Sequence, residues 1–190
     1  MYIVFEGIDG CGKSTQIELL KEKLPNVVVT KEPGGTDFGV KARELLLHSE
    51  IKSPKAELLL FLADRAEHYT EVVEPNLKNT LISDRGFLSG IAYAMSSNFD
   101  LNFLIELNKF TLNNNLPDKI VLFEITEDEL INRVGQREQD KIESRGFDYL
   151  LNIQKNMKKV ADIMNLDYLF IDATDSIENI HNKIIEYISN

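Results

Sequence analysis

The sequence predicts an α/β protein of three layers, in which a five-stranded parallel sheet lies between two layers of helices. Short apolar stretches of strand length alternate along the chain with longer stretches of helical periodicity. The short stretches are apolar throughout, which is typical of parallel strands that are buried on both faces. No internal repeat or linker interrupts the alternation, so we expect a single domain over residues 1–190.

The expected strands are rich in β-branched and aromatic residues, and they cover residues 2–5, 27–30, 81–84, 119–125 and 168–171. Ser53 before Pro54 predicts the start of a long helix, which Pro75 should end or kink. Thr126, with Glu129 three residues later, predicts another helix start. The remaining helical stretches are expected over residues 13–24, 40–47, 55–77, 88–95, 101–112, 147–164 and 177–188.

The composition is that of an acidic globular protein. The chain has 31 Asp and Glu residues against 21 Lys and Arg residues, and its net charge of −10 argues against broad binding to nucleic acid or anionic membrane. Cys11 is the only cysteine, which excludes an intramolecular disulfide and a zinc site of several cysteines. No apolar stretch reaches membrane-spanning length, and the N-terminus lacks the features of a signal peptide. We therefore expect a cytoplasmic protein.

Residues 7–14 read Gly-Ile-Asp-Gly-Cys-Gly-Lys-Ser and fit the phosphate-binding pattern G-x-x-x-x-G-K-[ST] without deviation. Glycines let backbone N–H groups turn toward phosphate oxygens, and the helix that follows points its positive dipole end at the same anion. Lys13 would reach the β- and γ-phosphates of ATP, and the Ser14 hydroxyl would bind Mg²⁺. We expect ATP to be held by Gly7, Ile8, Asp9, Gly10, Cys11, Gly12, Lys13, Ser14 and Thr15.

Two other interpretations of this loop are weaker. One is a glycine-rich turn between a strand and a helix that carries a lysine by chance. The other is a dinucleotide-binding fingerprint, because Glu32 follows the second expected strand. Thr15 stands where that fingerprint needs a third glycine, and the lysine and serine have no role in it.

A kinase of a phosphorylated acceptor needs cations for that second phosphate. Arginine suits this because its planar guanidinium binds phosphate through two parallel hydrogen bonds. Arg43, Arg65 and Arg85 follow expected strands or lie on helices that face their carboxyl ends, the edge where open α/β sheets bind ligands. On pattern alone, Arg43 and Arg65 would be solvated helix charges, and Phe61 and Tyr93 would be core residues.

Four segments together resemble the thymidylate kinases, over essentially the whole chain. Besides the phosphate loop, residues 30–36 (Thr-Lys-Glu-Pro-Gly-Gly-Thr) resemble the family's T-R-E-P-G-G-T stretch. Residues 58–66 resemble its nucleobase-binding helix, and residues 84–93 its D-R-[YF]-x-x-S-x-x-A-Y segment. The resemblance implies a P-loop NTPase fold and a homodimer that transfers the γ-phosphate of ATP to dTMP, with Mg²⁺, and gives dTDP and ADP.

The resemblance also implies roles around the phosphates. Arg43 and Arg85 would contact the acceptor phosphate. Asp9 would contact the 3′-hydroxyl of the acceptor sugar and organise the site around Mg²⁺. Asp84, at a strand end, would join Ser14 and Asp9 as a group that holds the metal.

Other roles implied by the resemblance concern the nucleoside. Arg65 would reach a base carbonyl, with Phe61 stacked on the thymine ring. Ser89 would hydrogen-bond the base. Tyr93 would press under C2′ of the sugar and disfavour a ribose hydroxyl.

Residues 133–146 resemble the mobile lid of the family. One subgroup of the family carries a catalytic arginine in the phosphate loop, at the position of Gly10. With a glycine there, this chain resembles the bacterial subgroup, whose catalytic arginines come from the lid. Lid closure would bring Arg133 and Arg137 to the phosphates, where transfer spreads negative charge, and would exclude water. The alternative is a solvated helix end. We expect the catalytic residues to be Asp9, Lys13, Arg85, Arg133 and Arg137.

Departures from the family pattern concern base recognition above all. Gly90 and Ala94 stand where polar residues often help to read the base. Thymine recognition should then depend on Arg65, Ser89 and Phe61, with looser selectivity or with water filling the gap. Lys31 and Gly86 also replace a usual arginine and a usual aromatic residue.

Two further functions are alternatives to a dTMP kinase. One is a kinase of another small (deoxy)nucleotide or of a deoxynucleoside. The other is a nucleotide switch or binding module, but the nearest match to a guanine-reading N-K-x-D motif, residues 108–111, lacks the aspartate. Cys11 fits a small filler better than a redox-active thiol. His48, His68 and His181 show no ligand-like spacing, and we expect surface or boundary positions for all three.

Overall fold

The computed structural model describes residues 1–134 and 145–190 of the chain. Its strands are parallel neighbours in one sheet with the order β2-β3-β1-β4-β5. Their bounds are β1 Tyr2–Glu6, β2 Val28–Lys31, β3 Leu81–Asp84, β4 Lys119–Glu124 and β5 Tyr168–Asp172. The prediction of a five-stranded parallel sheet in an α/β fold is confirmed.

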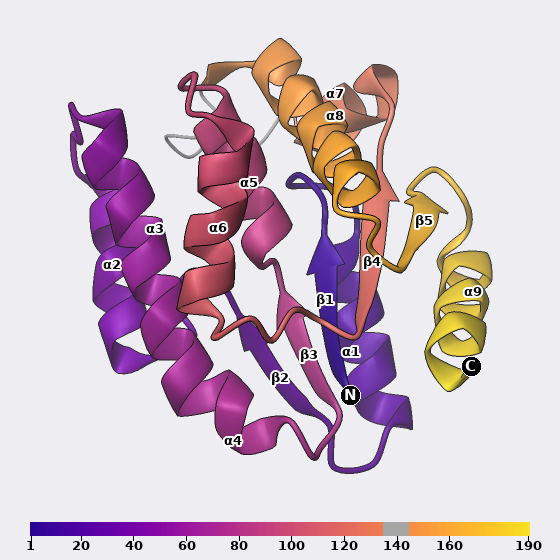
Figure 1. Ribbon diagram of the computed structural model, residues 1–190. Coiled ribbons are helices and arrows are strands. Elements are labelled where there is room, and N and C mark those ends of the chain that lie inside the picture. The colour runs from indigo at the N-terminus through magenta and orange to yellow at the C-terminus, as the bar shows by residue number, and fades with distance from the viewer. Residues whose placement is uncertain (135–144) are drawn as a thin grey trace.

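Helices cover both faces of this sheet (Figure 1). Helix α1 packs with α9 on one face, while α5 packs with α8 on the other. The helical bounds are α1 Lys13–Lys23, α2 Asp37–His48, α3 Pro54–His68, α4 Glu74–Asn76, α5 Phe87–Met95, α6 Leu101–Thr111, α7 Glu127–Val134, α8 Phe147–Ile163 and α9 Ile177–Ser189.

The long helix expected over residues 55–77 is one path with a widened turn in it. Helix α3 ends at His68, a π-helical turn covers Tyr69–Val73, and α4 follows. Pro75 has no N–H to donate to the preceding turn, and its ring crowds the carbonyl group four residues earlier. The Glu74 N–H donates a hydrogen bond to the Tyr69 carbonyl oxygen, five residues back. The helix is therefore widened by a π-helical turn and is not broken there.

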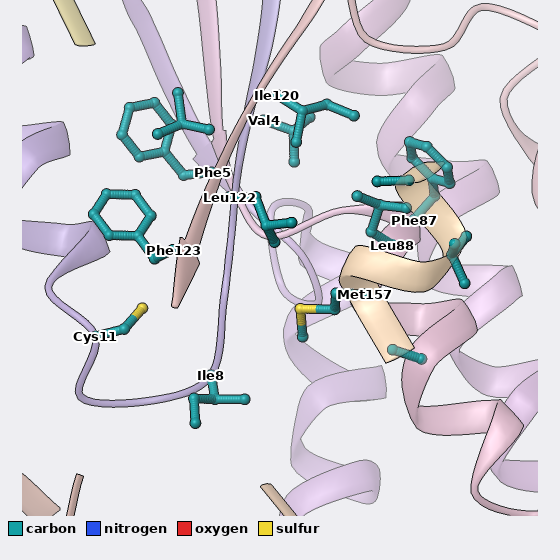
Figure 2. Close-up of a cluster of buried hydrophobic side chains, with 14 of the residues drawn as sticks. Val4, Phe5, Ile8, Cys11, Phe87, Leu88, Ile120, Leu122, Phe123 and Met157 are labelled. Carbon is teal, nitrogen blue, oxygen red and sulfur yellow. The ribbon is translucent and has the colours of Figure 1, made fainter. Parts of the chain in front are cut away.

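The hydrophobic core lies around the three central strands, β3, β1 and β4. Every residue of β1 is buried, because this strand has a neighbour on each side and helices over both faces. Figure 2 shows Phe5 and Phe123 on one side of these strands and Phe87, Leu88 and Met157 on the other. The apolar stretches of these central strands are buried on both faces, as expected, whereas the edge strands β2 and β5 are only partly buried.

The carboxyl ends of the strands bring the predicted motifs to one edge. In the sheet register, Asp84 of β3 lies beside Phe5 of β1 and beside Lys31 of β2. The phosphate loop, the loop after β2 and the residues after β3 therefore start side by side. Three segments that are about 25 to 75 residues apart in the sequence meet there.

Candidate active site

The phosphate loop is held open by glycines in the left-handed region. Gly10 has φ of 80° and Gly12 has φ of 95°. A Cβ atom at Gly10 would stand 2.5 Å from a methyl carbon of Val134, so no larger residue fits there unless α7 moves. Gly12 precedes α1 without any side-chain cap, which leaves backbone N–H groups of the first turn available to an anion.

Lys13 and Cys11 both point into the protein from this loop. The Lys13 ammonium donates to the carbonyl oxygens of Gly7 and Ile8, both at 3.0 Å, so it lies under the loop. Cys11 is 1% exposed and belongs to the hydrophobic core, where Figure 2 places it near Phe123. This burial supports the interpretation of Cys11 as a filler.

A cavity of about 500 Å³ opens over the loop. Arg133, at the end of α7, reaches it and donates to the carbonyl oxygens of Gly10 at 3.2 Å and Ala173 at 2.8 Å. Its Nε also pairs with Glu129 at 2.6 Å. We call this space the phosphate cavity; its lining residues include Asp9, Gly10, Gly12, Lys13, Ser14, Thr15, Asp84, Arg85 and Arg133.

The predicted metal-holding oxygens lie together in this cavity. The Ser14 hydroxyl donates to Asp84 Oδ2 at 3.4 Å. Asp84 Oδ1 is buried and has no hydrogen-bond partner among the described residues. Mg²⁺ is usually held by one or two carboxylates, with phosphates and waters completing its shell. These oxygen donors fit Mg²⁺. Over residues 1–134 and 145–190, no group of three or more His, Cys, Asp or Glu side chains forms a site for another metal ion.

Arg85 joins the loop to the acceptor side. Its backbone lies in the left-handed region with φ of 70°, which is costly for a residue with a Cβ atom and is typical of functional sites. Its guanidinium donates to the Gly7 carbonyl oxygen at 2.7 Å and to Ser89 Oγ at 3.3 Å. It also pairs with Asp9 at 2.9 Å. Burial lowers the pKa of Arg85, but the negative charges around it, Asp9 first among them and then Tyr93, Asp84 and Glu6, together outweigh burial and hold that pKa above its ordinary value.

A second cavity, which we call the acceptor cavity, lies beside the first. It brings together every residue that the sequence predicts for the acceptor. Phe61 is half-buried at its wall, so the core position that the pattern alone favours is wrong. Arg43 lies there with its Nη1 donating to the Pro33 carbonyl oxygen at 3.1 Å. The full lining is Asp9, Glu32, Pro33, Arg43, Leu47, Phe61, Arg65, Arg85, Gly86, Ser89, Gly90 and Tyr93.

Arg65 is a buried residue of this wall, not a solvated charge. Its side chain is 3% exposed and its Nε pairs with Glu32 at 2.8 Å. Glu32 also contacts Nδ1 of His68 at 2.8 Å, and Nε2 of His68 lies 2.7 Å from the Thr30 hydroxyl. Burial alone raises the pKa of the Glu32 carboxyl, but Arg65 and His68 outweigh it and lower that pKa below its usual value.

The expectation for the histidines is wrong for two of them. His68 is fully buried in the contact with Glu32, and His181 is buried against Gln16 of α1. His48 is exposed, as expected. The spacing rule detects only metal-like pairs of histidines. It does not detect a single histidine that is fixed by a buried carboxylate.

Sequence reasoning also missed two buried carboxylates. Glu6 ends β1 and accepts from the N–H of Leu88 at 3.1 Å and from the Ser89 hydroxyl. Asp64 accepts from the N–H of Gly34, in the loop after β2, at 3.1 Å. A signal was present for each: Glu6 is a charge directly after a run of four apolar residues, and Asp64 lies one residue before Arg65.

Part of the predicted lid lies outside the described residues. Arg137 belongs to that part. Tyr93 is described, and its ring packs 6.4 Å from that of Tyr149 of α8. Over residues 1–134 and 145–190, no helix has both the length and the apolar character needed to cross a bilayer.

Comparisons with known proteins point to one family. The family model described as thymidylate kinase matches residues 5–184. The thymidylate kinase of Sulfurovum sp. (strain NBC37-1) is 55% identical over 189 residues, which is 99% of each chain. That of Campylobacter concisus is 53% identical over 100% of this chain and 99% of its own. Among solved structures, the thymidylate kinase from Ehrlichia chaffeensis superposes with a TM-score of 0.81 at 29% identity, covering 100% of this chain and 98% of its own.

Proposed function

The chain belongs to the thymidylate kinase family, whose reaction transfers the γ-phosphate of ATP to dTMP, and from this premise we propose which of its residues perform that transfer. One observation carries the proposal. The phosphate cavity and the acceptor cavity share a wall of Asp9, Glu32, Arg43 and Arg85. A donor on one side and an acceptor on the other would meet at that wall.

The donor side binds ATP through the phosphate loop. Backbone N–H groups at the start of α1 take the phosphate oxygens, and Lys13 leaves its two carbonyl partners to contact the β- and γ-phosphates. Ser14, Asp84 and Asp9 would hold Mg²⁺, which supplies positive charge to the phosphates when it is bound. The orphaned Oδ1 of Asp84 supports this placement.

The acceptor side binds the phosphate and sugar of dTMP. Arg43 and Arg85 bind the acceptor phosphate, because they are the two guanidinium groups in the shared wall. Asp9 stays paired with Arg85 and contacts the 3′-hydroxyl of the sugar. No covalent intermediate is needed, since positioning and positive charge account for most catalysis of phosphoryl transfer.

The base lies at the far end of the acceptor cavity. Phe61 stacks on it, Tyr93 contacts the sugar edge, and Arg65 and Ser89 make polar contacts with the base. The Ser89 hydroxyl proton is already donated to Glu6, so Ser89 offers the base a lone pair. That arrangement suits a base N–H, as found at N3 of thymine. Arg133 and Arg137 complete the charge around the transferred phosphate.

Replacement of Arg85 by Ala tests the shared wall. We expect kcat to fall by about a hundredfold or more and the KM for dTMP to rise, because Arg85 contacts the acceptor phosphate at the point of transfer. Coupled ADP assays give both parameters. Lys159→Ala is the control, since Lys159 is an exposed cation on α8 that lines neither cavity. An Arg85→Ala enzyme with wild-type kcat and KM would remove Arg85 from the reaction.

Metal dependence is tested separately. Removal of Mg²⁺ by EDTA should abolish ADP formation, and Mg²⁺ should restore it. Asp84→Asn should raise the Mg²⁺ concentration needed for half-maximal rate, because one oxygen ligand loses its charge. An unchanged Mg²⁺ requirement in Asp84→Asn would assign the metal to other groups.

We also propose a cytoplasmic homodimer. The single cysteine is buried and suits a reducing compartment. Exposed apolar side chains on the neighbouring helices α2, α3 and α6 support the dimer.

A further inference from the structure

The terminal nitrogens of Arg65 lie against the backbone of α5 at Gly90. Both residues line the acceptor cavity, Arg65 from α3 and Gly90 from α5. A Cβ atom at position 90 would stand 2.9 Å from Nη1 and 3.0 Å from Nη2 of Arg65. The first of these distances is shorter than real Cβ atoms show, and the second is at that limit. Any side chain at position 90 therefore requires the guanidinium to move.

The guanidinium is fixed where it stands. Its Nε pairs with Glu32 at 2.8 Å, its Nη1 donates to the Asn108 side chain, and its Nη2 donates to the Gly86 carbonyl oxygen at 3.0 Å. These acceptors come from the loop after β2, from α6 and from the residues after β3. Arg65 is 3% exposed, so its guanidinium cannot exchange these partners for water. A shift of the guanidinium would break charge-assisted hydrogen bonds and would take one partner from the buried Glu32.

Two donors of Arg65 remain for a ligand. Arginine carries five N–H groups, and Glu32, Asn108 and Gly86 each take one. Among residues 1–134 and 145–190, no acceptor takes the second N–H of either terminal nitrogen, on the part of the side chain that lies beside Gly90 in the acceptor cavity. Two fixed donors suit an oxo group of a pyrimidine and repel an exocyclic amino group, which is itself a donor.

We propose that Gly90 is a specificity-determining residue of this enzyme, because its missing side chain seats Arg65 in the wall of the acceptor cavity. The inference rests on the role proposed above for Arg65. Arg65 then favours dTMP and dUMP, whose bases carry the oxo groups, over dCMP, whose base carries an amino group.

The test compares Gly90→Ala with Asn152→Ala. Both changes raise helix propensity, but Asn152 is exposed on α8 and lines neither cavity. In Gly90→Ala we expect the KM for dTMP to rise by about tenfold or more and the preference for dTMP over dCMP to fall by a similar factor. The KM for ATP should stay within about twofold of wild type. A purely structural role of Gly90 would instead lower the Tm with unchanged substrate constants, and a glycine without any role would give a raised Tm, as in Asn152→Ala.

Arg65→Lys supplies a second arm that does not depend on the folding of Gly90→Ala. It keeps the charge and removes the guanidinium, so the dTMP preference should fall, and adding Gly90→Ala should change little more. The inference is overturned if Gly90→Ala keeps the wild-type KM and preference, or if Arg65→Lys keeps the wild-type preference. Absence of dTMP turnover in the wild-type enzyme would instead contradict the proposed function itself.

Discussion

Asp64 is a buried carboxylate that contacts the loop after β2 and not the solvent. It is 1% exposed and accepts from the Gly34 N–H. Burial, with the nearby charge of Glu32, raises the pKa of Asp64 to about 6, although Gly34, Arg65 and His68 act in the opposite direction. The carboxyl therefore binds its proton more tightly in the folded than in the unfolded chain.

The sign of the resulting pH dependence follows from linkage. A group whose pKa is raised on folding stabilises the fold below its unfolded pKa, and this contribution is lost as the pH rises through about 6. Relative to Asp64→Asn, the wild type should lose about 1.5 kcal/mol of unfolding free energy between pH 5 and pH 7.5. Urea unfolding of both proteins at the two pH values measures this. Parallel pH profiles would show that Asp64 has an ordinary pKa.

Sequence reasoning at this scale was strong for residues in motifs. The combined motifs predicted that Arg43, Phe61 and Arg65 serve one acceptor site, and all three line the same cavity. Each residue alone is typical of an exposed helix or of a core. Glu32, which pairs with Arg65, and Glu6, which accepts from Leu88 and Ser89, could not be predicted as partners of these residues. Their roles depend on contacts between segments that only the sheet order brings together.

Helix α5 begins without a side-chain cap of its own. Gly86 stands at the cap position and offers no side chain, so Glu6 of β1 accepts the Leu88 N–H instead. The same carboxylate takes the Ser89 hydroxyl proton. One residue at the end of a strand thus sets the start of the helix that carries Ser89, Gly90 and Tyr93 into the acceptor cavity.

Glu6→Ala should destabilise the fold by about 2 kcal/mol, because it leaves a buried N–H and a buried hydroxyl without their acceptor. Glu6→Gln keeps an acceptor oxygen at the end of the same side chain and should cost clearly less. Denaturant unfolding ranks the two variants against wild type. Equal losses in both would mean that the charge of Glu6, and not its hydrogen bonds, supports α5.

The elements themselves were predicted closely, with one physical exception. Periodicity and caps placed most strands and helices within a few residues, as at α3, where Ser53 accepts from the Ala56 N–H at 3.3 Å. The widened turn before Pro75 was not predicted. A proline in a helical pattern indicates a break, a kink or a widened turn equally well, and the packing around residues 69–73 selects among them.

The whole molecule presents an apolar face on helices that Figure 1 shows at one side of the fold, α2, α3 and α6. Helix α2 packs on α3, and α3 packs on α6. Leu59 of α3 is 62% exposed and Phe110 of α6 is 77% exposed. Phe103 lies two helical turns before Phe110 on the same side of α6, and it is 53% exposed. Such a face is typical of a surface that another subunit covers.

Light scattering should therefore give twice the chain mass of 21.7 kDa at micromolar concentration. Phe110→Glu should shift the protein to the monomer, because a charge at the interface would be buried without a partner. Ile163→Glu is the matched control, since Ile163 is 54% exposed on α8, outside this face. A wild-type mass of 21.7 kDa at all concentrations would contradict the dimer.

The most direct measurement of the central claim is ADP production with Mg-ATP and a panel of dTMP, dUMP, dCMP and thymidine. The shared wall of the two cavities predicts transfer to a phosphorylated acceptor, and Arg65 in the acceptor cavity favours a base that offers oxo groups. We expect turnover to be fastest with dTMP and slower with dUMP, which lacks the 5-methyl group. It should be weak with dCMP, and absent with thymidine, which brings no phosphate to Arg43 and Arg85. ADP formation that does not depend on dTMP, or that is equally fast with thymidine, would contradict this assignment.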